Sequence, residues 1–216
     1  MKDLNWLWDY LPSLWEGLKL TVILTATSMI FGGVLGLPLA FMKMSKFRLA
    51  ASIAGAYGTV IRGMPLLVQI LLVYFGLPVL TGIRTPATIA GGIAMALYTA
   101  AFLAEVFRSG IQAVDRGQME AGRAIGFGHW QTMRLVIIPQ AFRTMIPNLA
   151  NQLSITLKNT SLLSVIGVTE LTLAGQNIYM QNFDMIRVLS IVGGMYLVIY
   201  LIAERMTGYL EQRVSR

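Results

Sequence analysis

The side chains best suited to chemistry lie in an apolar segment between Thr144 and Thr169, whose only charged residue is Lys158. Its polar residues recur at steps of four, three, three, four and three: Thr144, Asn148, Asn151, Ser154, Lys158 and Ser161. That spacing places them on one face of a helix. If the helix spans a membrane, this row of polar residues (the polar stripe) faces one of two surroundings. One is a water-filled pathway, and the other is a subunit interface (a seam) at which Asn and Ser form hydrogen bonds between helices. A lysine ammonium there is a suitable point-charge partner for a carboxylate.

Residues for catalysis are sparse. The chain has no cysteine and a single histidine, His129, which stands beside Trp130 without a second histidine or a near acidic pair. Thiolate chemistry, cysteine-ligated zinc and iron–sulfur clusters are therefore excluded, and an intramembrane enzyme lacks its base or metal ligands. A channel or self-sufficient secondary transporter is a third alternative, but the sequence shows neither the internal repeat nor the buried acids usual in such folds.

The composition indicates a helical membrane protein. Of the 216 residues, 56% are hydrophobic and 12% are charged, and the mean hydropathy is +0.65. A typical soluble domain has about 25% charged residues, so this chain has too few charged residues to cover a fully solvent-exposed surface. The net charge of +7 does not require a nucleic-acid partner, because membrane proteins collect Lys and Arg in cytoplasmic loops.

Five apolar runs are long enough to suggest transmembrane helices: Leu20–Met42, Gly63–Ile83, Thr85–Ala104, Thr144–Thr169 and Val188–Ala203. A shorter run at 49–61 precedes Arg62, which interrupts it. We expect this run to be an interfacial or partly buried lead-in to the second span. One long, tilted or kinked helix from about 50 to 80 is the alternative.

Basic residues predict the orientation. The predicted inner side carries Lys43, Lys46, Arg48, Arg108, Arg116, Arg123, Arg134, Arg143, Arg205, Arg213 and Arg216, and the outer side carries Lys2, Lys19, Arg84 and Arg187. This bias places the N-terminus outside, and both the 105–143 loop and the C-terminus in the cytoplasm.

The 105–143 loop is expected to contain short helices. A helix-forming run at 118–125 ends at Gly126-Phe127-Gly128, and a second helical pattern runs from His129 to Ile138 before Pro139. A short amphipathic helix held away from the bilayer could enter a groove on a soluble partner. The alternative is a helical hairpin that covers the inner mouth of the bundle.

The loop also resembles a known motif. The residues that carry the likeness are Glu120, Ala121, Gly122, Gly126, Val136, Ile138 and Pro139. Their spacing matches the Glu-Ala-Ala loop of ABC importer permeases, with Gly122 for the second Ala, Val136 for Ile and Ile138 for Leu. Three further elements are similar to the polar amino acid permease branch: 62–66 (Arg-Gly-Met-Pro-Leu), 137–143 and 158–162. The likeness extends from about Leu14 to Val214.

The resemblance implies a fold and a set of partners. Residues 1–216 would form one transmembrane permease domain, an all-α bundle of the type I ABC importer class in a bacterial cytoplasmic (inner) membrane. Such permeases pair as homodimers or heterodimers, bind two ATPase subunits and receive an amino acid from an extracytoplasmic binding protein. ATP and Mg²⁺ would belong to the ATPase, since the chain lacks a Gly-x-x-x-x-Gly-Lys-Ser/Thr loop. No metal or cofactor is expected here, and the remaining partner is membrane lipid.

Candidate site residues fall into three groups. The expected ATPase-coupling residues are Glu120, Ala121, Gly122, Gly126, Phe127 and Gly128. The expected substrate-pathway residues are Tyr98, Thr99, Asn151, Ser154, Lys158, Asn159, Thr160 and Ser161. Gating or structural roles are expected for Arg62, Pro65, Gln69 and Glu105, with Arg62 near the inner end and paired with Glu105. Lys158 could anchor a substrate carboxylate, repel cations or pair with Glu170, and the amino acid carried is left open.

Overall fold

The computed structural model describes residues 5–214, and the side chains of residues 8–209. Two of the basic residues used for orientation, Lys2 and Arg216, lie outside the described residues. The long helices are α1 (Asn5–Met44), α4 (Ala87–Gln112), α7 (Ile138–Asn159) and α9 (Met185–Val214). Shorter helices are α2 (Arg48–Gly63), α3 (Leu66–Thr81), α5 (Arg116–Ala124), α6 (His129–Thr132) and α8 (Leu171–Asn182). A π-helical turn at Met133–Ile137 precedes α7, and a 3-10 segment at Thr160–Ile166 follows it.

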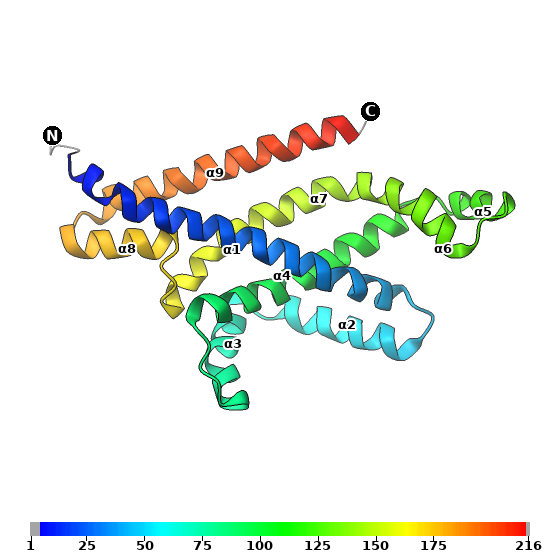
Figure 1. The fold of residues 1–216 in the computed structure, drawn as a ribbon, viewed down its shortest axis with the longest axis horizontal. Helices are drawn as coiled ribbons and strands as arrows, with labels where there is room; N and C mark the ends of the chain where they lie inside the picture. Colours follow the sequence, from blue (N-terminus) through cyan, green and yellow to red (C-terminus); the bar gives the residue numbers. More distant parts are fainter. Residues whose placement is uncertain (1–4, 215–216) are drawn as a thin grey trace.

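The long helices lie roughly along one axis, with α5 and α6 at one end and α8 at the other (Figure 1). Helix α1 packs along α4 because glycines let the two backbones approach. A Cβ on Gly32 would lie 2.7 Å from Cγ2 of Thr99, and one on Gly36 would lie 3.0 Å from the carbonyl oxygen of Ala100. Small residues at such a seam permit close packing of membrane helices.

Within the described part of the chain, three helices are long and apolar enough to cross a membrane, at Trp8–Met44, Ala87–Gln112 and Met185–Tyr209. They confirm the first, third and fifth predicted spans. Helices α2 and α3 pass the same test together but meet at an angle of 106°. The predicted span at 144–169 is not apolar enough to pass, because α7 carries the polar stripe. Helix α7 nevertheless packs between α4 and α9.

The bend between α2 and α3 has a local cause. Pro65 disfavours a helical backbone at the preceding residue, and Met64 is extended (φ −105°, ψ 141°). The side chain of Gln69 is buried and donates from Nε2 to the carbonyl oxygens of Ile61 at 2.7 Å and Met64 at 2.9 Å. Residues 49–61 therefore belong to a helix separate from α3, and no continuous helix runs from 50 to 80. Pro65 and Gln69 thus shape the bend between α2 and α3.

Glu105 connects α4 to the C-terminal end of α1, but not through Arg62. Its carboxylate accepts a hydrogen bond from Nζ of Lys43 at 2.7 Å and is also bonded by Arg108 one turn later on α4. The predicted pair of Arg62 with Glu105 is wrong. Arg62 instead donates from Nε to the carbonyl oxygen of Gly58 at 3.0 Å, within its own helix.

Candidate functional site

A polar pocket of about 460 Å³ lies between α7 and α9. Its lining residues are Ala150, Asn151, Ser154, Ile155, Lys158, Tyr200, Glu204, Thr207 and Gly208. Three of the predicted pathway residues, Asn151, Ser154 and Lys158, thus share one pocket, as their helical spacing predicts. The α9 wall comes from the C-terminal part of the apolar helix Met185–Tyr209.

Tyr200 connects the two charged residues of this polar pocket. The Nζ of Lys158 lies over its ring, 4.6 Å from the centroid, which is a cation–π contact. The Tyr200 hydroxyl lies 3.4 Å from Oε1 of Glu204. The side chains of Lys158 and Glu204 are both exposed in the isolated chain, so they can contact a bound molecule.

The possible pair of Lys158 with Glu170 is not formed. Glu170 is fully buried and begins α8, where its carboxylate accepts from the backbone N–H groups of Thr172 and Leu173, both at 3.0 Å. It also accepts from the hydroxyl of Tyr196 at 2.7 Å. These donors satisfy the buried carboxylate, which is what such a group requires. Glu170 therefore fixes α8 against α9.

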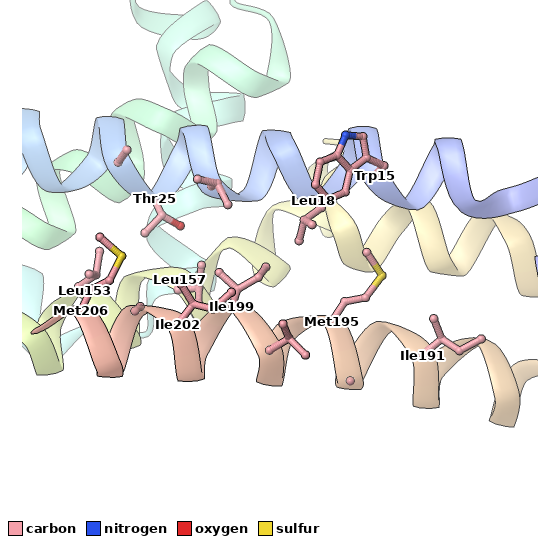
Figure 2. A pocket seen from close by; sticks show the side chains of 15 residues that line it. Trp15, Leu18, Thr25, Leu153, Leu157, Ile191, Met195, Ile199, Ile202 and Met206 are labelled. Atoms are coloured by element: carbon pink, nitrogen blue, oxygen red, sulfur yellow. The ribbon is translucent and has the colours of Figure 1, made fainter. Parts of the chain in front are cut away.

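The opposite side of the α7–α9 pair is apolar. A groove of about 750 Å³ lies there. Side chains of α1, α7 and α9 converge on it, Leu157 and Ile199 among them (Figure 2). Its lining carries one hydroxyl, that of Thr25, which donates to the carbonyl oxygen of Thr21 at 2.8 Å within α1. The α7–α9 pair therefore has one apolar side and one polar side.

The other predicted pathway residues lie outside the polar pocket. Thr99 is fully buried where α1 contacts α4, and it packs against Gly32. The side chain of Asn159 lies near that of Tyr98 of α4. Thr160 is buried, and its hydroxyl donates to the carbonyl oxygen of Leu157 at 2.7 Å. The Ser161 hydroxyl donates to the carbonyl oxygen of Lys158, also at 2.7 Å.

The helical spacing fails beyond Lys158 because α7 ends at Asn159 and continues as a 3-10 segment. A 3-10 helix has three residues per turn, so the face that a residue occupies changes. Sequence reasoning also missed the α9 wall. Tyr200, Glu204 and Thr207 recur at steps of four and three, the same signal that identified the α7 stripe, but the predicted span ended at Ala203.

The 105–143 loop forms a compact unit around α5. Asp115 caps the helix by accepting from the backbone N–H of Gly117 at 2.8 Å. Gly122 is buried against Thr132 of α6, whereas Glu120 and Ala121 are exposed. The chain then turns through Gly126, whose φ of +92° is a left-handed conformation that favours glycine.

The turn after α5 is held by further contacts. Phe127 is half-buried, and the backbone N–H of Gly128 donates to Oε1 of Gln131 at 2.9 Å. Gln140, at the start of α7, donates to the side chain of Gln118 at 3.1 Å. The predicted helix, break and second helix are therefore present, and one face of α5 is free to contact another protein.

A bundle of long apolar helices with a polar pocket and an exposed loop helix is the arrangement of a transport permease rather than of an enzyme. The chain belongs to the family of binding-protein-dependent transport system inner membrane components, whose model matches residues 32–216. The resemblance seen in the loop motif is thus confirmed. The chain is a transporter subunit in a membrane.

Similar proteins agree with this family. The glutamine transport system permease protein GlnP of Escherichia coli (strain K12) is 36% identical over 214 residues, which cover 99% of this chain and 98% of that protein. The arginine transport system permease protein ArtQ of Bacillus subtilis (strain 168) is 35% identical, with 95% and 94% covered. The crystal structure of an amino acid ABC transporter with histidines has a TM-score of 0.91 and 38% identity, and 99% of each chain is covered.

Proposed function

We propose that this chain is the permease subunit of an ATP-driven importer that carries a polar amino acid across a bacterial inner membrane. The observation that carries the proposal is the polar pocket between α7 and α9, which is lined by Lys158 of α7 and Glu204 of α9. Charged groups on membrane helices need a hydrated or polar neighbour. Relatives of nearly equal identity are named for glutamine and for arginine. The substrate class is therefore an amino acid, and its side chain is left open.

The proposed complex contains a second permease, either another copy or a paralogue, two ATPase subunits and an extracytoplasmic binding protein. The N-terminus lies outside and the loop of α5 and α6 lies in the cytoplasm. ATP and Mg²⁺ are bound by the ATPase, and this chain holds no cofactor. Its remaining contacts are with membrane lipid.

Helix α5 is the proposed coupling helix. Its exposed face, with Glu120 and Ala121, enters a cleft of the ATPase, while Gly122, Gly126 and Phe127 hold the loop in shape. An arginine at Ala121 would add bulk and charge to the exposed face without touching the buried contacts. It should abolish uptake while the protein still inserts, whereas Ser45→Arg, on the exposed turn after α1, should not.

The direct test is uptake of labelled L-glutamine, L-arginine and L-glutamate by cells that express the permease with its ATPase and binding protein. ATP-dependent uptake of at least one is expected, and the loss of all uptake in Glu120→Ala with Gly126→Pro. Proline cannot adopt the positive φ of residue 126. Because the chain has no cysteine, a single thiol at Ala121 should cross-link specifically to the ATPase. Normal uptake in the double variant would refute the coupling role.

A further inference from the structure

We propose that the polar pocket binds the two backbone charges of a zwitterionic amino acid, the carboxylate at Lys158 and the ammonium at Glu204. The inference rests on the proposed function and extends it. It gives two residues of α9, Tyr200 and Glu204, a part in substrate recognition. The groups that this chain recognises are then the α-carboxylate and the α-ammonium of the amino acid, not its side chain.

The two charges in the pocket are opposite in sign but do not pair with each other. Among the side chains that the structure describes, the ion pairs are Lys19–Glu16, Lys43–Glu105, Arg108–Glu105 and Arg187–Asp184. Tyr200 stands between the pocket charges, with its ring under the ammonium of Lys158 and its hydroxyl near the carboxylate of Glu204. The ring thus keeps a cation and an anion apart within one cavity.

This separation favours a ligand that carries both charges. An ionisable group inside a span is costly unless it is paired or hydrated. A ligand with one charge would pair with one wall of the pocket and leave the charge on the other wall without an ionic partner. A zwitterion compensates both walls at once, and the occupied pocket is then neutral.

The size and the remaining lining suit this ligand. A volume of about 460 Å³ lies within the range of about 300–1,000 Å³ typical of small-molecule sites. Asn151 and Ser154 add an amide and a hydroxyl that can both donate and accept hydrogen bonds. The Thr207 hydroxyl donates to the carbonyl oxygen of Glu204 at 2.9 Å within α9, so it can accept a hydrogen bond from a ligand. The larger groove on the other side of α7 has no charged lining residue, so it cannot recognise a zwitterion in this way.

The test uses the permease assembled with its ATPase and binding protein in liposomes, with L-glutamine, L-arginine and L-glutamate as probes. Lys158→Met and Glu204→Gln should each reduce the uptake rate by about tenfold to hundredfold, the effect of losing one hydrogen bond to a charged group. ATP hydrolysis stimulated by the binding protein should persist. Arg205→Gln is the matched control, because Arg205 neighbours Glu204 on α9 but does not line the pocket.

Two further variants separate recognition from packing. Tyr200→Phe keeps the ring under Lys158 and removes the hydroxyl, so it should lower uptake less than Glu204→Gln. Exchanging the charges, Lys158→Glu with Glu204→Lys, keeps one of each sign across the pocket and should restore part of the uptake that each single change removes. A role in packing alone predicts no such recovery.

The outcomes are distinct. If the wild-type complex transports none of the probes, the proposed function fails. If it transports and both neutralising variants transport equally well, the zwitterion assignment is refuted while the importer stands. If the variants lose uptake because the two permease subunits separate on size-exclusion chromatography, the charges hold a seam between subunits, and the assignment is again refuted.

Discussion

An alanine at Gly122 should disrupt the loop helix, even though alanine is the better helix former. A Cβ at this position would lie 2.4 Å from Cγ2, 2.9 Å from Oγ1 and 3.2 Å from Cβ of Thr132. Thr132 cannot easily turn away, because its side chain is fully buried and its hydroxyl donates to the carbonyl oxygen of Gly128 at 3.1 Å. The collision therefore has to move α5 relative to α6.

The expected magnitude comes from two opposing effects. Forcing an extra carbon into a packed site costs about 1–3 kcal/mol, and replacing Gly by Ala in a helix gains about 1 kcal/mol. Gly122→Ala should therefore lower the local stability of α5 by up to about 2 kcal/mol. In a Thr132→Ala background the colliding methyl and hydroxyl are gone, so the same change should raise stability by about 1 kcal/mol.

Hydrogen exchange of the backbone amides of Arg116–Ala124 measures this local stability in the reconstituted protein. Gly55→Ala in α2 is the control for helix propensity, because nothing lies within 4 Å of the added carbon. It should increase protection of its own helix. If Gly122→Ala alone protects α5 as much as Gly55→Ala protects α2, the close contact with Thr132 is not what requires glycine.

Three further predictions concern the bundle. Gly36→Ala places a carbon 3.0 Å from the carbonyl oxygen of Ala100, so it should lower the apparent Tm by weakening the α1–α4 seam, at a cost of about 1–3 kcal/mol; an unchanged Tm would contradict this contact. Glu105→Gln removes the ionic partner of Lys43 and Arg108 and should cost on the order of 1 kcal/mol, again measured as Tm. Cysteines at Arg84 and Arg116 should react with impermeant reagents from outside and from the cytoplasm respectively, and labelling from one side only would overturn the orientation.

The long apolar helices could be predicted from sequence because composition and length determine them. The angle between α2 and α3 could not. Pro65 predicts a boundary, but the turn of 106° is held by Gln69, which reaches back to bond two carbonyl oxygens. A contact of this kind depends on the bend that it stabilises, and helical periodicity carries no information about it.

Charge pairing between spans was equally inaccessible. The predicted topology suggests an ion pair between Glu105 and Arg62, but in the structure Glu105 pairs with Lys43 at the end of α1. Sequence places all three residues near the inner side but does not say which helices are neighbours. The extensive packing of α1 against α4, made possible by Gly32 and Gly36, is what decides the partner.

One wall of the polar pocket was predictable and the other was not recognised. Lys158 and its stripe stand out because they interrupt an apolar run. Glu204 was treated as the boundary of the last span, but α9 continues to Val214, so this carboxylate remains within the helix. Its relation to Lys158 exists only because α7 and α9 pack side by side.

The weak hydropathy of α7 and the proposed transport function have the same cause. A span that fits an apolar environment on all sides would pass a hydropathy test, and α7 does not pass it. Leu153 and Leu157 of α7 line the apolar groove (Figure 2), while Asn151, Ser154 and Lys158 line the polar pocket. Replacing these polar residues with leucine would make α7 a more apolar membrane span. It would also remove the groups that can hold a charged solute in the polar pocket.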